Sequence, residues 1–194
     1  MSLRDWVNVP DGAHEIVTLF RMRHERKIIR LREFDYRNNG AYEVTICVHE
    51  RRLAFGRIEH GEMRLHAFGH IAQERWLAIP SHHPNVVLDE FIVMPNHIHG
   101  ILFLEGDTPP TLEEEIELRQ FGQPQSGSLG TVIGSFKSGV TRQIVERRGN
   151  KTRVWQPRFY EHIIRNDRDL QLQREYIRDN PAKWPDDELN THGS

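Results

Sequence analysis

Cysteine is nearly absent from this chain of 194 residues, since Cys47 is the only one. A disulfide framework therefore cannot hold the fold together. Long apolar runs are missing too, because stretches such as 92–94 and 101–104 are far shorter than the ~20 residues that span a bilayer. The first residues also lack the charged start and apolar segment of a secretory signal. These absences favour a protein of the reducing cytoplasm with no membrane partner.

Net charge is also small, because 26 lysines and arginines nearly balance 28 aspartates and glutamates. Taken over the whole chain, this balance argues against a nucleic-acid partner. The charges are segregated, however: residues 134–184 hold twelve basic and six acidic side chains, whereas residues 105–117 hold six acidic and no basic ones. A folded chain with this pattern can present one positive face while it stays close to neutral overall.

Hydrophobic residues make up 37% of the chain, which suffices for the core of one compact domain. Alternating apolar residues predict strands at 41–48, 86–94, 97–104 and 159–164, a short hairpin at 55–62, and a very short strand at 154–155. Helical spacing predicts a helix over 65–81, closed by Pro80, with His82 and His83 in the loop after it. A second helix begins near Leu129, with an apolar stripe at positions 129, 132, 133, 136, 140 and 144. A third runs from an Asn166 cap to Asn180, before Pro181.

The order of these elements indicates an α+β fold. A strand, a hairpin and a helix come first, then two strands, a helix, a strand and a helix. This order is typical of the ferredoxin-like or RRM-like arrangement, an antiparallel sheet with helices mainly on one face. Fold alone does not give function.

Two histidines, His97 and His99, stand at i and i+2 in the second strand of a predicted hairpin. Because each strand residue rises about 3.3 Å, these side chains project from one face some 6 to 7 Å apart, and two imidazoles can reach one metal ion. Ile98 between them points into the core. On spacing alone, two surface histidines with no special role remain the alternative.

Tyr176 and Asn180 lie at i and i+4 on the last predicted helix, so they share a face. A phenol and an amide oxygen placed in this way can meet one metal ion or one phosphate. Since the pKa of a free tyrosine is near 10, a nucleophilic Tyr176 needs a metal or basic surroundings, and Arg174 and Arg178 supply positive charge. A half-buried tyrosine with Asn180 as a helix cap is the plainer interpretation.

Together the two motifs resemble those of a known family, the single-tyrosine HUH transposases, and within it the REP-associated tyrosine transposases. Residues 94–99, Met-Pro-Asn-His-Ile-His, match the family's histidine motif, and residues 176–181, Tyr-Ile-Arg-Asp-Asn-Pro, match its Tyr-Ile-x-x-Asn-Pro motif. The resemblance extends over about residues 30–184. Glu43 departs from it, at a strand position where the family usually carries an aromatic residue, and we expect this to affect the packing of the strand rather than the site.

The resemblance implies a metal-dependent endonuclease and transposase acting on single-stranded DNA. His97 and His99 would hold a divalent ion, Mg²⁺ or Mn²⁺, with Asn180 as third ligand. Tyr176 would attack a phosphodiester beside a DNA hairpin, leaving a 5′-phosphotyrosine and a free 3′-hydroxyl that allows rejoining without ATP. Phosphate contacts are expected from basic side chains on the last two helices and between them, namely Lys137, Arg142, Arg147, Arg148, Arg153, Arg158, Arg174 and Arg178.

The resemblance also divides the chain. Residues 1–30 form an N-terminal extension, 31–184 the catalytic domain with an acidic loop insertion at 105–127, and 185–194 a C-terminal tail. A cytoplasmic, nucleoid-associated protein is expected, and a homodimer and a monomer both stay open.

Other functions compete with this one. A replication initiator of the wider HUH class typically carries Tyr-x-x-Lys, whereas position 179 is Asp. A phosphoesterase of the alternating-histidine kind would need a third histidine, where Gly100 and Ile101 follow instead. A DNA-binding regulator that has lost catalysis would not need the complete motifs seen here. Tyr160 is the rival nucleophile, and otherwise a strand residue near the edge of the sheet.

Overall fold

The computed structural model describes residues 40–105 and 128–190 of the chain. The chain divides into two units, Met1–Asp35 and Tyr36–Ser194, and all the described residues belong to the second. The expected N-terminal extension lies outside the described residues, as does the acidic insertion beyond Glu105. No helix within the described ranges combines the length and the apolar character needed to cross a bilayer.

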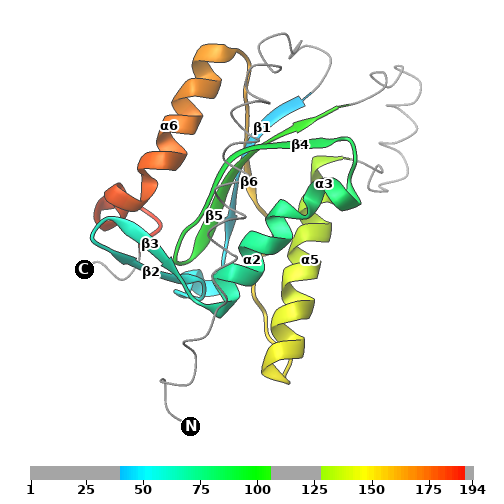
Figure 1. The fold of residues 1–194 in the computed structure, drawn as a ribbon, viewed down its shortest axis with the longest axis vertical. Helices are drawn as coiled ribbons and strands as arrows, with labels where there is room; N and C mark the ends of the chain where they lie inside the picture. Colours follow the sequence, from blue (N-terminus) through cyan, green and yellow to red (C-terminus); the bar gives the residue numbers. More distant parts are fainter. Residues whose placement is uncertain (1–39, 106–127, 191–194) are drawn as a thin grey trace. The chain divides into compact units, whose positions relative to one another are not determined.

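Four antiparallel strands form the main sheet, in the order β4-β5-β1-β6 (Figure 1). In the middle, β1 (Gly40–Cys47) pairs with β5 (His97–Leu104) on one side and with β6 (Tyr160–Ile163) on the other. The outer neighbour of β5 is β4 (Val86–Val93). This strand order is that of the ferredoxin-like split βαβ arrangement, so the predicted α+β fold is confirmed.

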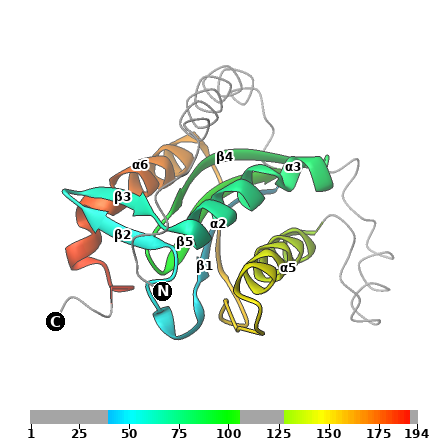
Figure 2. The ribbon, with the colours of Figure 1, turned by 60° about the horizontal axis from the view of Figure 1, so that its bottom comes forward.

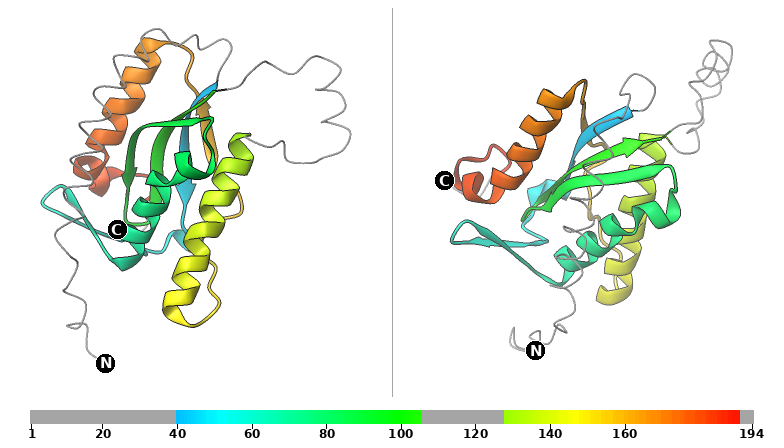
Figure 3. Two further views of the ribbon diagram at one scale, coloured as in Figure 1. Left: turned by 45° about the vertical axis from the view of Figure 1, so that its right-hand side comes forward. Right: turned by 45° about the horizontal axis from the view of Figure 1, so that its top comes forward.

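Helices cover both faces of this sheet. On one face α2 (Ala67–Leu77) and α5 (Leu129–Arg148) pack together, while α6 (Asp167–Lys183) crosses the other face against β4 and β5 (Figures 1 and 3). Because strand side chains alternate, Ile98 and Gly100 face α2, and His97 and His99 face α6. Gly100 lies so close to α2 that a Cβ there would collide with the ring of Trp76.

The predicted apolar stripe of α5 is confirmed residue by residue. Ser128 caps the helix by accepting a hydrogen bond from the backbone N–H of Thr131, and Gly149 ends it with a left-handed φ of 73°. All six stripe residues are buried: Leu129, Val132, Ile133, Phe136, Val140 and Ile144. The polar side chains of α5 therefore face away from the sheet.

A separate hairpin of β2 (Gly56–Glu59) and β3 (Glu62–Leu65) confirms the predicted turn. Its two turn residues, His60 and Gly61, both have positive φ, 55° and 78°, as the tight turns of hairpins require. The turn reaches the end of α6 (Figure 2), since a Cβ on Gly61 would lie 3.8 Å from the Cα of Ala182.

The first predicted helix was wrong at both ends. Leu65 belongs to β3, and the segment to 81 forms two helices, α2 and the short α3 (Ile79–His82). Pro80 does not close a helix. It lies in the first turn of α3, where a backbone N–H would have no acceptor within the helix, so its absence costs no helical hydrogen bond. As a result His82 ends α3 instead of lying in a loop.

The end of α6 was also predicted wrongly. The helix begins at the expected cap, where the Asn166 side chain accepts a hydrogen bond from the Asp169 N–H at 2.9 Å, but it continues through Pro181 to Lys183. It is followed by the turn η2 (Trp184–Asp186). Since Pro181 lies in the last turn, few helical hydrogen bonds depend on it. The very short strand predicted at 154–155 is reduced to an isolated bridge between Val48 and Trp155.

Candidate active site

The candidate site lies between the sheet and α6, where His97 and His99 face the helix. Both side chains are buried, with 0% and 2% of their surface exposed, and their ring centroids are 4.6 Å apart in an edge-to-face arrangement. The antiparallel register places Cys47 opposite His97 and Thr45 opposite His99. The expected pairing of the two imidazoles on one face is therefore present.

His99 is held by two side chains of β1. Its Nδ1 lies 3.0 Å from Oε1 of Glu43 and 2.9 Å from Oγ1 of Thr45. Because an ionised carboxylate only accepts hydrogen bonds, Nδ1 of His99 carries the proton and donates a hydrogen bond to Glu43. The lone pair of His99 is then on Nε2. Glu43 is buried, so its departure from the family pattern is not the packing difference that we expected but a direct contact with the site.

His97 has the same tautomer, through a different partner. Its Nδ1 lies 2.8 Å from Oδ1 of Asn96, whose own amide nitrogen donates to the carbonyls of Arg51 and Leu189 at 3.2 and 2.8 Å. These two acceptors fix which way the Asn96 amide points, so Nδ1 of His97 is the donor. Burial, then the neighbouring His99 and Arg51, lowers the pKa of His97 well below its usual 6.5, and the ring stays neutral.

Three polar atoms in this site are buried and have no hydrogen-bond partner among the described residues. They are Nε2 of His97, Nε2 of His99 and Oδ1 of Asn180. Leaving such atoms unpaired costs free energy unless something else binds them. Two neutral imidazole nitrogens and an amide oxygen all offer lone pairs, which is the donor set of a divalent cation site. The residues present thus fit the metal that the sequence implied.

A site made only of the usual ionisable ligands is not found. Across residues 40–105 and 128–190, no three His, Cys, Asp or Glu side chains are grouped so that they could hold a metal ion. A third protein ligand next to the two histidines would therefore be the amide of Asn180.

Tyr176 stands at the open side of the site. Its ring lies 5.1 Å from that of His99, edge to face, and 44% of the residue is exposed. Partial burial raises the pKa of the phenol, Asp187 raises it further, and a hydrogen bond with the Asn180 side chain acts in the opposite direction. The helix thus presents a neutral phenol to solvent, one turn from Asn180 and directly beside a histidine.

Two ion pairs fasten α6 to β4. Arg174 donates to both carboxylate oxygens of the buried Asp89, and Arg178 donates to Glu90 at 2.6 and 3.0 Å. A register shift between Leu88 and Phe91 interrupts β4 at this point. The prediction that Arg174 contacts DNA was wrong, because the residue is 3% exposed and its guanidinium is already bound by Asp89.

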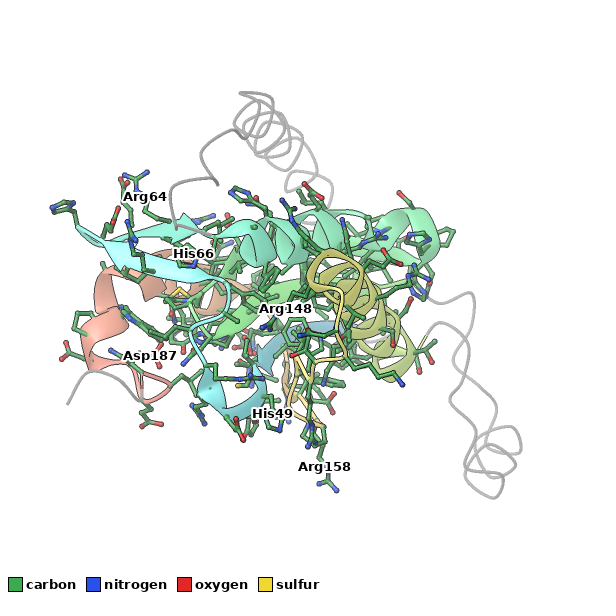
Figure 4. The ribbon with its side chains drawn as sticks, turned by 90° about the horizontal axis from the view of Figure 1, so that it is seen from below. His49, Arg64, His66, Arg148, Arg158 and Asp187 are labelled. Atoms are coloured by element: carbon green, nitrogen blue, oxygen red, sulfur yellow. The ribbon has the colours of Figure 1, made fainter. Side chains whose placement is uncertain are left out.

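Of the other predicted DNA contacts, Arg178 alone lies on the helix that carries the tyrosine. Arg142, Arg147 and Arg148 are exposed on α5, which covers the opposite face of the sheet, and Arg178 is paired with Glu90. Figure 4 shows Arg148 and Arg158 beside α5 and the segment that follows it, and Asp187 beside the end of α6. Lys137 donates to the carbonyls of Gln156 and Arg158. The structure brings together Tyr176, His97, His99 and Asn180, but not the basic residues around them.

The rival nucleophile Tyr160 lies on β6, opposite Thr45, and is 62% exposed. It therefore shares the face of the sheet that α6 crosses. Within the described residues it has no ring contact with either histidine, in contrast to Tyr176. Geometry favours Tyr176.

Several residues of the site escaped sequence reasoning, namely Glu43, Thr45, Asn96, Asp89 and Asp187. Glu43 and Thr45 did carry a signal: they have the same i, i+2 spacing as the histidines and lie in the strand that pairs with them. Asp89 lies 85 residues from Arg174, so no local pattern connects the two.

Fold and site together define a small α+β domain that holds a tyrosine on a helix above a buried histidine pair. No family model matches the chain. It is 36% identical over 169 residues to an uncharacterised protein of Haemophilus influenzae, covering 86% of this chain and 93% of that protein. It is 26% identical over 149 residues to the REP-associated tyrosine transposase of Escherichia coli, covering 76% of this chain and 70% of that protein.

Among solved structures, that of a REP-associated tyrosine transposase bound to a REP hairpin aligns with 75% of this chain and 68% of that chain, at 23% identity and a TM-score of 0.47. The named relatives, at 26–27% identity, are REP-associated tyrosine transposases, so the chain resembles that family of transposases, as its two motifs predict.

Proposed function

We propose that this protein cleaves and rejoins single-stranded DNA next to a hairpin, through a covalent bond between Tyr176 and the DNA. The observation that supports the proposal most directly is the set of three unpaired buried atoms beside Tyr176, on His97, His99 and Asn180. Lone pairs from two imidazoles and an amide next to a tyrosine hydroxyl are what a metal-assisted nucleophilic site requires.

In the proposed reaction, Oη of Tyr176 attacks the phosphorus of a phosphodiester. A bond forms between Oη and phosphorus, and the bond from phosphorus to the 3′-oxygen breaks. The phenol proton leaves to solvent, to which the residue is exposed, and the departing 3′-oxygen takes up a proton. The products are a 5′-phosphotyrosine and a free 3′-hydroxyl. Attack by a 3′-hydroxyl on this intermediate reverses the step and joins two strands.

His97, His99 and Asn180 would hold the divalent ion, Mg²⁺ or Mn²⁺. When bound, the ion supplies Lewis-acid stabilisation and orientation of the phosphate. Two imidazoles favour Mn²⁺ over Mg²⁺, because Mg²⁺ prefers oxygen ligands. Neutral ligands leave the full charge of the cation available to the phosphate and to the phenolate. The hairpin substrate is inferred from the family, whose solved member is described as bound to a REP hairpin.

The test uses an end-labelled DNA hairpin with a single-stranded flank, incubated with the protein and Mn²⁺. With the label at the 3′ end, we expect a protein–DNA adduct that survives denaturation and carries the fragment downstream of the break, joined through its new 5′ phosphate. Tyr176→Phe should abolish it, while Tyr160→Phe, the matched loss of an exposed hydroxyl on the same face, should leave it intact. Chelation and His97→Ala should abolish cleavage more than binding. An adduct that persists in Tyr176→Phe refutes the assignment, and binding without any adduct supports a regulator.

A further inference from the structure

A hollow of ≈ 520 Å³ lies beside α5, outside the site just described. One wall is formed by Lys137 and Thr141 of α5. The other is formed by the segment that follows this helix, Lys151, Thr152, Arg153, Val154, Trp155, Gln156 and Pro157. Three of the lining side chains are basic, and none is acidic.

The two walls are tied together by specific hydrogen bonds. Nζ of Lys137 donates to the carbonyl of Gln156 at 2.6 Å, and Nε1 of Trp155 donates to the carbonyl of Lys137 at 3.0 Å. The indole of Trp155 packs on the rings of Phe55 and Phe136, with centroids 5.3 and 5.7 Å away. The hollow is therefore formed before any ligand binds, which lowers the entropic cost of binding.

The positive charges of the hollow are not neutralised by the protein. Within residues 40–105 and 128–190, Lys137, Lys151 and Arg153 have no ion-pair partner. Arg52, which donates to the Arg153 carbonyl at 2.7 Å, is paired with Glu50 at 4.0 Å. Like charges held near one another repel, and a bound anion would offset that repulsion. The positive lining of the hollow therefore attracts an anionic ligand, and the phosphate of a nucleotide is such an anion.

The hollow lies on the α5 side of the sheet, across from the histidines, but its outer wall is a neighbour of the strand that pairs with them. The backbone of its outer wall continues the sheet beyond β1, since the N–H of Gln156 donates to the carbonyl of Cys47 at 3.0 Å and that of His49 to the carbonyl of Val154 at 2.8 Å. Cys47 is the strand partner of His97. Two strand spacings, about 10 Å, thus separate the backbone of His97 from this wall. Figure 4 shows Arg158, just past the wall, on the same side as His49.

We propose that the hollow binds an unpaired nucleotide of the substrate strand, with its phosphate on Lys151 and Arg153 and its base against Pro157. The hollow is open to solvent, and its basic side chains and Pro157 offer contacts for a phosphate and for the face of a base. The inference rests on the proposed function, because it places the flank of the same DNA strand that Tyr176 would cleave.

The test compares two double variants that lose the same charge. One is Lys151→Ala with Arg153→Ala, both exposed and outside the bonds that lock the walls. The control is Arg57→Ala with Arg64→Ala on the β2–β3 hairpin, where the two arginines pair with Glu59 and Glu62. Figure 4 shows Arg64 far from Arg158. Both pairs are made in metal-free Tyr176→Phe protein, and affinity for a labelled single strand is measured by anisotropy over a series of KCl concentrations.

The Lys151/Arg153 variant should bind the single strand roughly tenfold more weakly. Its slope of log affinity against log salt should be smaller by about 0.7, since one phosphate of a single strand is no longer neutralised. The control should keep the wild-type slope, and the charge-preserving pair Lys151→Arg with Arg153→Lys should restore it. An unchanged slope overturns the proposal, and so does an equal loss on a blunt duplex, which would mean that the charges act without regard to unpaired nucleotides.

This experiment stands apart from the test of the proposed function. Binding is measured without metal and without the nucleophile, so absence of a Tyr176 adduct does not change its outcome.

Discussion

Each of the two histidines in the candidate site has a different partner behind it. A buried carboxylate, Glu43, accepts from His99, while the neutral amide of Asn96 accepts from His97. Both contacts place the free lone pair on Nε2, but only the carboxylate also makes the imidazole a stronger donor to a cation. Glu43 is thus a positioning residue, which acts on the proposed metal through His99.

Replacing Glu43 tests this role. Glu43→Gln keeps an acceptor in place but removes the charge, so we expect affinity for Mn²⁺ to fall about 10- to 100-fold. The free Mn²⁺ signal in electron paramagnetic resonance measures this in the absence of DNA. Glu161→Gln is the matched control, because Glu161 is exposed on the neighbouring strand opposite Val44. Equal Mn²⁺ affinity in Glu43→Gln and wild type would contradict the prediction.

The buried neutral state of His97 predicts a pH dependence of stability in the metal-free protein. Burial lowers the pKa of His97 in the folded protein below the usual 6.5, which it keeps in the unfolded chain. At pH values between these two pKa values, the unfolded chain therefore binds a proton at His97 that the folded chain does not. The free energy of unfolding should therefore fall as the pH drops below about 6.5. Denaturant titrations at several pH values measure it. His97→Asn should flatten the slope, and His60→Asn in the exposed hairpin turn should not.

At the scale of elements, the main question is what holds α6 in register over the histidines. Consecutive strand residues normally point to opposite faces, yet Asp89 and Glu90 both bind arginines of α6. The register shift between Leu88 and Phe91 explains this, because a bulge redirects one side chain. Arg174 and Arg178 lie one helical turn apart and match the two carboxylates.

The two pairs should differ strongly in their contribution to stability. Asp89→Asn leaves a buried guanidinium without its counter-charge, which should cost about 3 kcal/mol of unfolding free energy. Glu90→Gln breaks a pair whose arginine is half exposed, which should cost at most about 1 kcal/mol. Urea unfolding measures both. Similar losses in the two variants would show that burial does not separate these pairs.

Elements with a clear period could be predicted from the sequence, as the six buried residues of α5 show. The ends at Pro80 and Pro181 could not, since the cost of a proline depends on its position in a helix, which the apolar pattern does not reveal. Contacts across the fold were also out of reach. Glu43 meets His99 over 56 residues, and only the register of β1 against β5 brings them together.

Among residues 40–105 and 128–190, the segregation of charge along the sequence does not become a basic surface around the tyrosine. Arg174 and Arg178 are bound by carboxylates of β4, and the arginines of α5 lie across the sheet. Acidic residues, in contrast, do lie near the tyrosine. Asp187 and Glu188, just past the end of α6, raise the pKa of Tyr176. Sums over a segment count charges, but they do not say which face carries them.

The acidic residues just past the end of α6 should control how readily Tyr176 ionises. After burial, Asp187 is the largest cause of the raised pKa of Tyr176, so Asp187→Asn should lower that pKa. The substitution keeps the side-chain oxygen that accepts from the Leu189 N–H at 2.7 Å, which preserves the local turn. At a fixed pH below the pKa, a larger fraction of phenolate should then speed adduct formation, and a less negative site should bind DNA more tightly.

An ultraviolet titration of metal-free protein, with Tyr176→Phe subtracted, reports the ionisation of Tyr176 alone. Asp167→Asn is the control, because it removes the same charge at the other end of α6, about 13 Å along the helix axis from Tyr176. A titration midpoint that stays put in Asp187→Asn, or that moves equally in Asp167→Asn, would mean that net charge rather than the neighbouring carboxylate sets the ionisation of the nucleophile.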